Sequence, residues 1–94
     1  MEKKRKILIL DDEASIANMI SDFCSFFGFE TKVLTTEQEI KGVMDAVKSY
    51  RPDLITLDLM MPGLSGIDIL NLLRQNEETK NTPVIIISAI AGND

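Results

Sequence analysis

Residues 7–12 read Ile7-Leu8-Ile9-Leu10-Asp11-Asp12, an unbroken apolar run that stops at two carboxylates. A run of this kind is typical of a β-strand that is covered on both of its faces. Residues 54–58 repeat the pattern, because Leu-Ile-Thr-Leu leads directly into Asp58, and residues 84–88 form a similar run that ends at Ser88. The sequence therefore predicts buried strands that carry polar groups at their carboxyl ends.

Helical patterns alternate with these strands. Over residues 16–27 the apolar side chains recur at the spacing of one helix face, and Gly28 follows as a helix end. A capping-box pattern at Thr36 and Glu39 precedes a second helix, which Pro52 stops. In chain order we expect strands at 7–10, 30–34, 54–57 and 84–88, and helices at 16–27, 40–50 and 66–73, the last after a capping-box pattern at Ser65 and Asp68.

Regular alternation of strand and helix indicates an α/β fold, with parallel strands joined by right-handed crossovers and helices on both faces of the sheet. All strands then point the same way. The residues at their carboxyl ends collect on one edge of the sheet, where open α/β sheets place their ligand sites. These residues are Asp11, Asp12, Asp58 and Ser88.

The composition fits one small domain. With 94 residues, of which 45% are hydrophobic, the chain can form one core and has no room for a second. Its apolar runs are far shorter than the roughly 18 residues of a membrane span, and no apolar signal segment follows the basic start. The single cysteine cannot form an internal disulfide. Because the chain has no histidine, we propose no metal site with thiolate and imidazole ligands. We expect a water-soluble, cytoplasmic protein.

The charge argues against direct contact with nucleic acid. The chain has a net charge of -5, whereas binding to a phosphate backbone relies on clustered Lys and Arg. The one basic cluster along the sequence is Lys3-Lys4-Arg5-Lys6. From the sequence alone we interpret this cluster as a solvated N-terminal segment that keeps the first strand soluble, not as a binding patch.

The three aspartates form a candidate metal site. For the pair Asp11 and Asp12 alone, a structural interpretation is as good as a functional one. Asp12 could cap the helix that follows, and Asp11 could interact with the helix dipole. Asp58 is different, because an ion directly after a buried strand is costly unless something compensates it. Three carboxylates at one edge repel one another unless a cation lies between them. Oxygen ligands with little room for a full cage favour Mg²⁺.

A Mg²⁺ site at this edge indicates phosphoryl chemistry. An aspartate carboxylate can be the nucleophile that takes a phosphoryl group, while the metal neutralises charge on the transferring oxygens. Asp58 is the candidate nucleophile, and the Ser88 hydroxyl is a candidate hydrogen-bond donor to a phosphoryl oxygen. For Ser88 alone, a strand-terminal serine that satisfies the backbone is an equally good interpretation.

Three blocks of sequence make the chain resemble the receiver domain of bacterial two-component response regulators. They are Ile-Leu-Ile-Leu-Asp-Asp-Glu at 7–13, Pro-Asp-Leu-Ile-Thr-Leu-Asp-Leu-Met-Met-Pro-Gly-Leu-Ser-Gly at 52–66 and Thr-Pro-Val-Ile-Ile-Ile-Ser-Ala at 82–89. The resemblance runs from Lys6 to about Ala89, and the order and spacing of the blocks make it specific. It implies a flavodoxin-like, three-layer fold with the strand order 2-1-3-4.

The resemblance also implies roles for the acidic residues. Asp58 would be phosphorylated by a histidine kinase, so the protein would be a phosphoacceptor of a two-component phosphorelay and not an enzyme. Asp12 would bind Mg²⁺ directly and Asp11 through water. The backbone carbonyl of Met60 would be a further metal ligand.

Other residues gain roles from the resemblance as well. Ser88 would match the hydroxyl residue that couples the phosphoryl group to a change at the surface, and the small Ala89 would leave room beside the phosphate. Pro62, Gly63 and Gly66 would shape the loop after Asp58, where turn chemistry and close helix packing require the same residues.

Residues 1–94 are expected to form a receiver domain without the family's usual fourth helix, fifth strand and fifth helix. The lysine and the aromatic residue that the family carries on its fifth strand then have no counterpart. The strand at 84–87 would be an exposed apolar edge. We expect a homodimer through this edge or through the uncovered face of the sheet.

The preferred function is that of a phosphoacceptor that works with a histidine kinase and with an output domain or downstream protein. The alternative is a shortened receiver that no longer signals by phosphorylation and serves as a protein association module. A metal-dependent phosphatase is disfavoured, because its usual second acid would stand where the chain has Met60. A flavin-binding relative ranks last, because Asp11 and Asp12 replace the phosphate loop that it needs.

Overall fold

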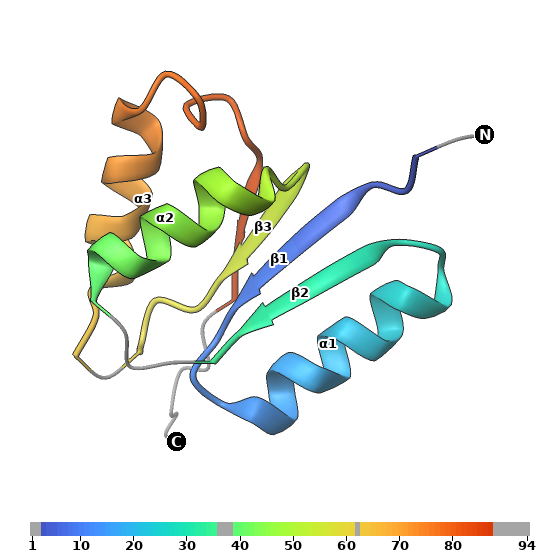
Figure 1. Cartoon of the computed structure of the whole chain (residues 1–94). Helices are drawn as coiled ribbons and strands as arrows, with labels where there is room; N and C mark the ends of the chain where they lie inside the picture. The colour runs from blue at the N-terminus through green and yellow to red at the C-terminus, as the bar shows by residue number, and fades with distance from the viewer. Residues whose placement is uncertain (1–2, 36–38, 62, 88–94) are drawn as a thin grey trace.

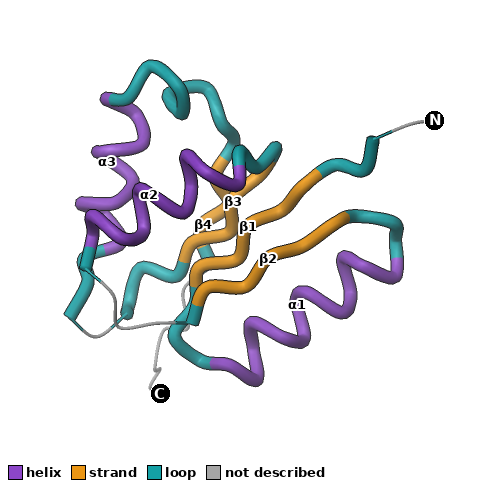
Figure 2. The backbone as a smooth tube through the Cα atoms, viewed as in Figure 1, coloured by secondary structure: helices purple, strands orange, loops and turns teal. Residues whose placement is uncertain are grey.

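The structure, a computed structural model, describes residues 3–35, 39–61 and 63–87. Its elements are β1 (Lys6–Leu10), α1 (Ala14–Phe26), β2 (Glu30–Leu34), α2 (Ile40–Tyr50), β3 (Leu54–Leu57), α3 (Gly66–Gln75) and β4 (Val84–Ile86). The four strands form one parallel sheet in the order β2-β1-β3-β4 (Figure 2). The predicted parallel α/β fold and its strand order are confirmed.

The helices cover the sheet in two layers. Helix α1 lies on one face, and α2 and α3 lie together on the other (Figure 1). Because successive side chains of a strand point to opposite faces, β1 supplies both cores. Leu8 and Leu10 pack with α2 and α3, whereas Ile7 and Ile9 pack against Ala17 of α1. These four residues of β1 are all buried, as the apolar run predicts.

Helix α1 has nearly the predicted bounds but buries only part of its apolar face. Ala17 is buried and Cys24 packs beside it, while Met19, Phe23 and Phe27 expose 64%, 67% and 62% of their surface. The rings of Phe23 and Phe27 contact each other, with centroids 5.1 Å apart. Helical periodicity predicts how wide an apolar face is, but not which part of it meets the sheet.

The ends of the helices follow the local chemistry of the chain. Gly28 takes a φ of 94° after α1, and Arg51 takes the left-handed conformation, with a φ of 56°, after α2. The side chain of Ser65 accepts a hydrogen bond from the Asp68 N–H at 3.2 Å, which confirms the predicted cap of α3. Thr36, the other predicted cap, lies outside the described residues.

Strand β4 is shorter than the apolar run predicts. It ends at Ile86, although the Ile87 N–H still donates to the Leu57 carbonyl at 2.9 Å, and Ser88 lies outside the described residues. Ile85 and Ile86 expose 50% and 41% of their surface on this edge strand. Among the helices that the structure describes, none is long and apolar enough to cross a membrane.

Candidate functional site

The pairing of the strands places Asp11 and Asp58 side by side. Leu10 of β1 pairs with Leu57 of β3, so the next residue of each strand is an aspartate. The Asp58 N–H donates to the Leu10 carbonyl at 3.0 Å, and the Asp11 N–H donates to the Leu34 carbonyl at 3.2 Å. Main-chain hydrogen bonds therefore fix both aspartates at the carboxyl edge of the sheet, where they are 4% and 8% exposed.

Asp12 completes an acidic cluster with these two residues. It is exposed, and one carboxylate oxygen from each of the three residues lies within 4.8 Å of the others. Over the described ranges this is the one group of three or more His, Cys, Asp or Glu side chains close enough to share a metal ion. The cluster opens into a cavity of about 190 Å³, lined by Asp11, Asp12, Glu13, Ile16, Asp58, Met60 and Ile87. The predicted convergence of the three aspartates is confirmed.

Backbone donors orient the two buried carboxylates. Oδ1 of Asp58 accepts from the Met60 N–H at 2.9 Å, and Oδ1 of Asp11 accepts from the Glu13 N–H, also at 2.9 Å. No donor in the described part of the chain reaches Oδ2 of either residue. Each buried carboxylate thus has one oxygen held by the backbone and one left to bind a ligand.

The predicted helix cap at Asp12 is wrong, whereas the expected interaction of Asp11 with the helix dipole stays a prediction. The residue before α1 is Glu13, and its side chain makes no capping hydrogen bond. Asp12 does not occupy the cap position, and Asp11 binds the backbone N–H of Glu13 ahead of the helix. The local role of Asp11 is to close the turn between β1 and α1, which leaves its second oxygen at the cavity.

The charge around the cavity favours a cation. Among the residues that the structure describes, its lining includes four acidic residues and neither lysine nor arginine. The two ion pairs seen among the described residues, Lys41 with Asp45 and Lys80 with Glu77, lie elsewhere. Buried carboxylates without a positive partner are costly, and clustered carboxylate oxygens are the ligands that hard divalent cations prefer. The residues present therefore fit a divalent metal ion.

The loop after Asp58 depends on two glycines. A Cβ atom on Gly66 would lie 2.7 Å from the Leu59 Cα and 3.1 Å from the Asp58 carbonyl oxygen, so α3 can approach this loop only with glycine there. Gly63 takes a φ of 75°, which side chains disfavour. Pro62, predicted to shape the same loop, lies outside the described residues.

The remaining predicted site residues differ in what the structure says of them. Met60 lines the cavity, and its N–H contributes to the site by holding Asp58, while the role of its carbonyl as a metal ligand stays a prediction. Ser88 and Ala89 lie outside the described residues. Sequence reasoning missed Glu13 as a cavity residue, although it directly follows Asp11 and Asp12 in the first sequence block.

Comparison with known proteins gives a consistent family. The sequence matches the family model of the response regulator receiver domain over residues 7–94. It is 36% identical over 86 residues to the DNA-binding response regulator MtrA of Mycolicibacterium paratuberculosis. It is 37% identical over 90 residues to the phosphate regulon transcriptional regulatory protein PhoB of Pseudomonas aeruginosa. These alignments cover 92% and 96% of this chain but 36% and 38% of those proteins, so the chain spans little more than a third of their length.

Solved structures agree in fold. The receiver domain of the Francisella response regulator 1452 superposes with a TM-score of 0.77 at 34% identity, over 96% of this chain and 70% of that chain. The chemotaxis protein CheY4 of Vibrio cholerae gives a TM-score of 0.82 at 23% identity, over 96% of this chain and 72% of that chain. At the lower identity the likeness is one of fold alone. Both structures share the flavodoxin-like arrangement of the sheet that the resemblance implies.

Proposed function

The chain belongs to the response regulator receiver domain family, the phosphoacceptor domains of two-component signalling, and we propose that it accepts a phosphoryl group on Asp58. The observation that carries the proposal is the cavity in which the carboxylates of Asp11, Asp12 and Asp58 meet. Family membership favours this role over that of an association module.

Mg²⁺ is the cofactor that this cavity fits best. Asp12 would bind it directly and Asp11 through water, while Asp58 and the Met60 carbonyl would supply further oxygens. Such a site, with few protein ligands and room for water, is the kind that Mg²⁺ prefers. When bound, the ion would neutralise charge on the oxygens of the transferring phosphoryl group.

In the proposed step Oδ2 of Asp58 attacks the phosphorus of a phosphohistidine on the kinase. A P–O bond forms to Asp58 and the P–N bond breaks. The electron pair of that bond stays on the imidazole nitrogen, which takes a proton from solvent. The Met60 N–H supports the step because it holds Oδ1 and so presents Oδ2 to the incoming phosphorus. The product is an acyl phosphate on Asp58.

Ser88 would then hydrogen-bond to a phosphoryl oxygen and couple phosphorylation to the surface. Its support is its place in the chain, directly after Ile87, which lines the cavity and donates its N–H to β3.

The partners follow from the family. The phosphodonor would be a histidine kinase, and the chain itself would be cytoplasmic. The phosphorylated domain would act on an output domain or a downstream protein without being an enzyme itself. MtrA and PhoB are named as DNA-binding and transcriptional regulators, and this chain matches little more than a third of each. A net charge of -5 supports a role for the chain without direct nucleic-acid contact.

A second copy of the chain is a further proposed partner. Strand β4 is an edge of the sheet, and its exposed Ile85 and Ile86 make that edge suitable for strand pairing. Light scattering at micromolar concentration should show a dimer, and Ile85→Lys should shift it to monomer. A clean monomer of the unaltered chain would contradict pairing.

The phosphoacceptor proposal is tested with a small acyl phosphate donor and Mg²⁺. Intact mass spectrometry should show the addition of one phosphoryl group to the unaltered chain and none to Asp58→Asn. Asp45→Asn is the matched control, because Asp45 is an exposed acid that pairs with Lys41 away from the cavity. No addition to the unaltered chain, or an addition that persists in Asp58→Asn, would refute the proposal.

A further inference from the structure

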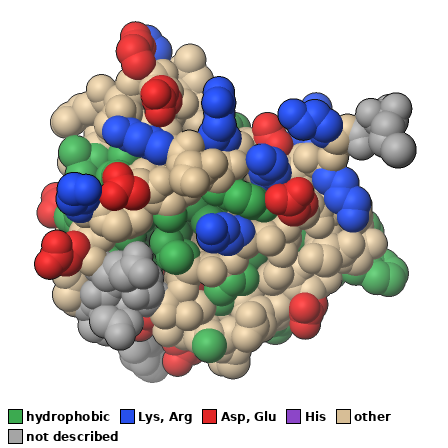
Figure 3. All heavy atoms as spheres, viewed as in Figure 1, with side chains coloured by type: hydrophobic (Ala, Val, Ile, Leu, Met, Phe, Trp, Pro, Cys, Tyr) green, Lys and Arg blue, Asp and Glu red, His purple; other side chains and the backbone are tan. Residues whose placement is uncertain are grey.

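Positive charge gathers at the end of the sheet opposite to the acidic cavity. Seven of the ten Lys and Arg residues lie there or beside Tyr50, and we call them the basic edge: Lys3, Lys4, Arg5, Lys6, Lys32, Lys48 and Arg51. On the face shown in Figure 3, Lys and Arg side chains gather on the side of the N-terminus. The sequence shows only the first four as a cluster, because β2 and the end of α2 add the other three in space.

The basic edge differs from the rest of the surface in how its charges are used. Lys41 and Lys80 form ion pairs of 3.2 Å and 2.9 Å with nearby acids. The Arg74 guanidinium binds backbone carbonyls, the nearest being that of Thr82 at 2.8 Å. Within the described ranges, no member of the basic edge forms a side-chain ion pair. Its charges therefore remain available to a partner.

Three acids near the basic edge leave it positive. Glu30 accepts a hydrogen bond from the Tyr50 hydroxyl at 2.9 Å, and Asp53 accepts one from the Lys6 backbone N–H at 2.8 Å. Glu78 reaches the edge from the loop after α3. All but one of the seven basic side chains are exposed, so their charges face solvent.

Tyr50 arranges two of the ammonium groups. The Nζ atoms of Lys6 and Lys32 lie 5.2 Å and 5.7 Å from the centre of the Tyr50 ring, within the range of cation–π attraction. Lys6 Nζ also donates to the Tyr50 carbonyl at 3.2 Å. These contacts hold the two charges in place without neutralising them.

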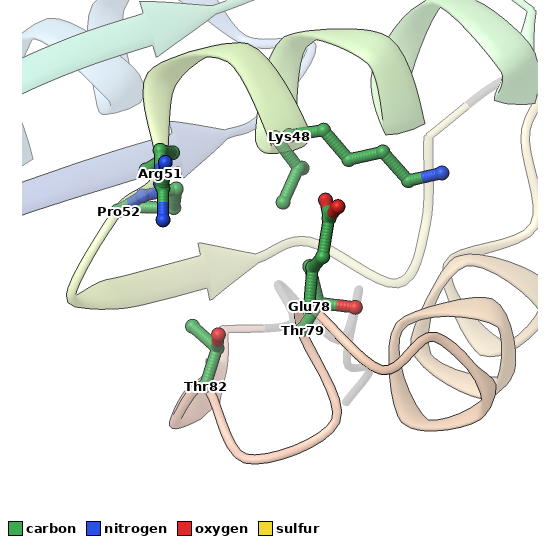
Figure 4. Close-up of a pocket in the computed structure, with 7 residues that line it drawn as sticks. Lys48, Arg51, Pro52, Glu78, Thr79 and Thr82 are labelled. Carbon is green, nitrogen blue, oxygen red and sulfur yellow. The ribbon is translucent and has the colours of Figure 1, made fainter.

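Two adjoining hollows shape the basic edge. One of about 550 Å³ is lined by Lys3, Lys4, Arg5, Lys6, Arg51 and Asp53. The other, of about 430 Å³, is lined by Val47, Lys48, Arg51, Pro52, Glu78, Thr79 and Thr82. Figure 4 shows the second hollow between the end of α2 and the loop after α3. Because Arg51 borders both, the two hollows adjoin and form one surface.

We propose that the basic edge binds a short acidic peptide segment of another protein. Unpaired cations beside two open hollows match a chain of carboxylates. The charge of the whole chain favours a short acidic peptide over a long polyanion or an anionic membrane. At about 0.15 M salt, charges act over about 8 Å, so a short segment meets mainly the local positive patch. A long polyanion such as duplex DNA, or an anionic membrane, would also meet the acids that give the chain its charge of -5. The inference stands apart from the phosphoacceptor function.

Fluorescence anisotropy tests the proposal with a short labelled peptide of alternating Glu and Ser, at low and at physiological salt. We expect binding that weakens as salt rises, and no binding of a Gln and Ser peptide of the same length. Arg5→Gln with Lys48→Gln should raise Kd about fivefold, since each exposed charge pair contributes modestly. Lys41→Gln is the control for each of these substitutions made singly, because it removes one positive charge away from the basic edge and should leave Kd unchanged.

Three outcomes would overturn the proposal. The first is no binding of the acidic peptide at low salt. The second is an equal loss of affinity in Lys41→Gln and in Arg5→Gln or Lys48→Gln made singly, since net charge and not the basic edge would then govern binding. The third is tighter binding of a duplex oligonucleotide or of anionic vesicles than of the peptide, because the edge would then be a polyanion surface. Circular dichroism of each variant confirms that the fold is kept.

Discussion

The two ends of the strands carry opposite charge and are built in different ways. At the carboxyl edge, Asp11 and Asp58 are buried and held by main-chain hydrogen bonds between neighbouring strands. At the basic edge, side chains from the N-terminal segment, β2 and α2 meet, and none of them forms an ion pair with another described residue. This difference indicates that a reaction at a single atom requires side chains whose positions are fixed by the register of the strands. Attraction of a charged segment requires only that like charges gather.

The largest expected effect tests whether the carboxyl edge with Asp11, Asp12 and Asp58, here called the acidic edge, is more rigid than the basic edge. Leu57 is fully buried directly before Asp58, so Leu57→Ala should lower the free energy of unfolding by about 2–5 kcal/mol. Lys48→Ala at the exposed basic edge should change it by no more than about 0.5 kcal/mol. Urea unfolding followed by circular dichroism measures both. Similar losses in the two variants would remove the contrast.

The next effect concerns the loop after Asp58. Gly66→Ala places a Cβ atom against the backbone of Leu59, which should cost about 1–3 kcal/mol of stability. Because the same clash reaches the Asp58 carbonyl oxygen, the variant should also bind Mg²⁺ more weakly. Gly28→Ala is the control, since it strains a positive φ far from the cavity and should leave Mg²⁺ affinity unchanged. Full Mg²⁺ affinity in Gly66→Ala would show that the loop yields without moving the site.

The acidic edge could be predicted from the sequence, and the reason is local. A buried strand must end where an apolar run ends, so the position of Asp11 after Leu10 and of Asp58 after Leu57 follows from sequence alone. Parallel strands then bring both residues to one edge. The backbone donors at Glu13 and Met60 could not be predicted, because they depend on turn geometry.

The basic edge could be predicted only in part, because Lys3–Lys6 form a cluster in the sequence whereas its other three members are far apart in the chain. Nothing in the sequence places Lys32 beside Tyr50, or Arg51 beside the first residues. The exposure of Phe23 on α1 could not be predicted for a similar reason, since periodicity does not say which part of an apolar face the sheet covers. Local pattern predicts elements and their ends, whereas surfaces arise from packing.

Metal addition sharpens the comparison by acting on one edge only. Mg²⁺ at tenfold excess over its Kd should stabilise the chain by about 1.4 kcal/mol, because it binds the folded state alone. Asp12→Asn should abolish this rise in Tm, and Asp45→Asn should keep it. Without Mg²⁺, Asp12→Asn should unfold at a higher temperature than the unaltered chain, since it relieves repulsion among clustered carboxylates. An Asp12→Asn variant that keeps the full Mg²⁺ response would place the metal elsewhere.

The smallest effect belongs to Tyr50 at the basic edge. Burial raises the pKa of Tyr50 to about 12 from its usual 10.0, and the hydrogen bond to Glu30 is the next cause. The folded state thus holds the phenol proton more tightly than the unfolded state. The resulting stability is fully present below pH 10 and is lost as the pH rises through about 12. Tyr50→Phe should lose this pH dependence and cost about 0.5 kcal/mol at neutral pH, because the hydrogen bond is exposed to solvent.

Tyrosinate absorbance measures this pKa directly, since the chain has one tyrosine and no tryptophan. Glu30→Gln should lower the pKa of Tyr50 toward its usual value without reaching it, because burial remains, and Glu39→Gln should not change it. A pKa already at the usual value in the unaltered chain would mean that the Tyr50 ring is freely solvated. Lys6 and Lys32 would then have no fixed ring between them, and the basic edge would be a loose collection of charges and not a formed surface.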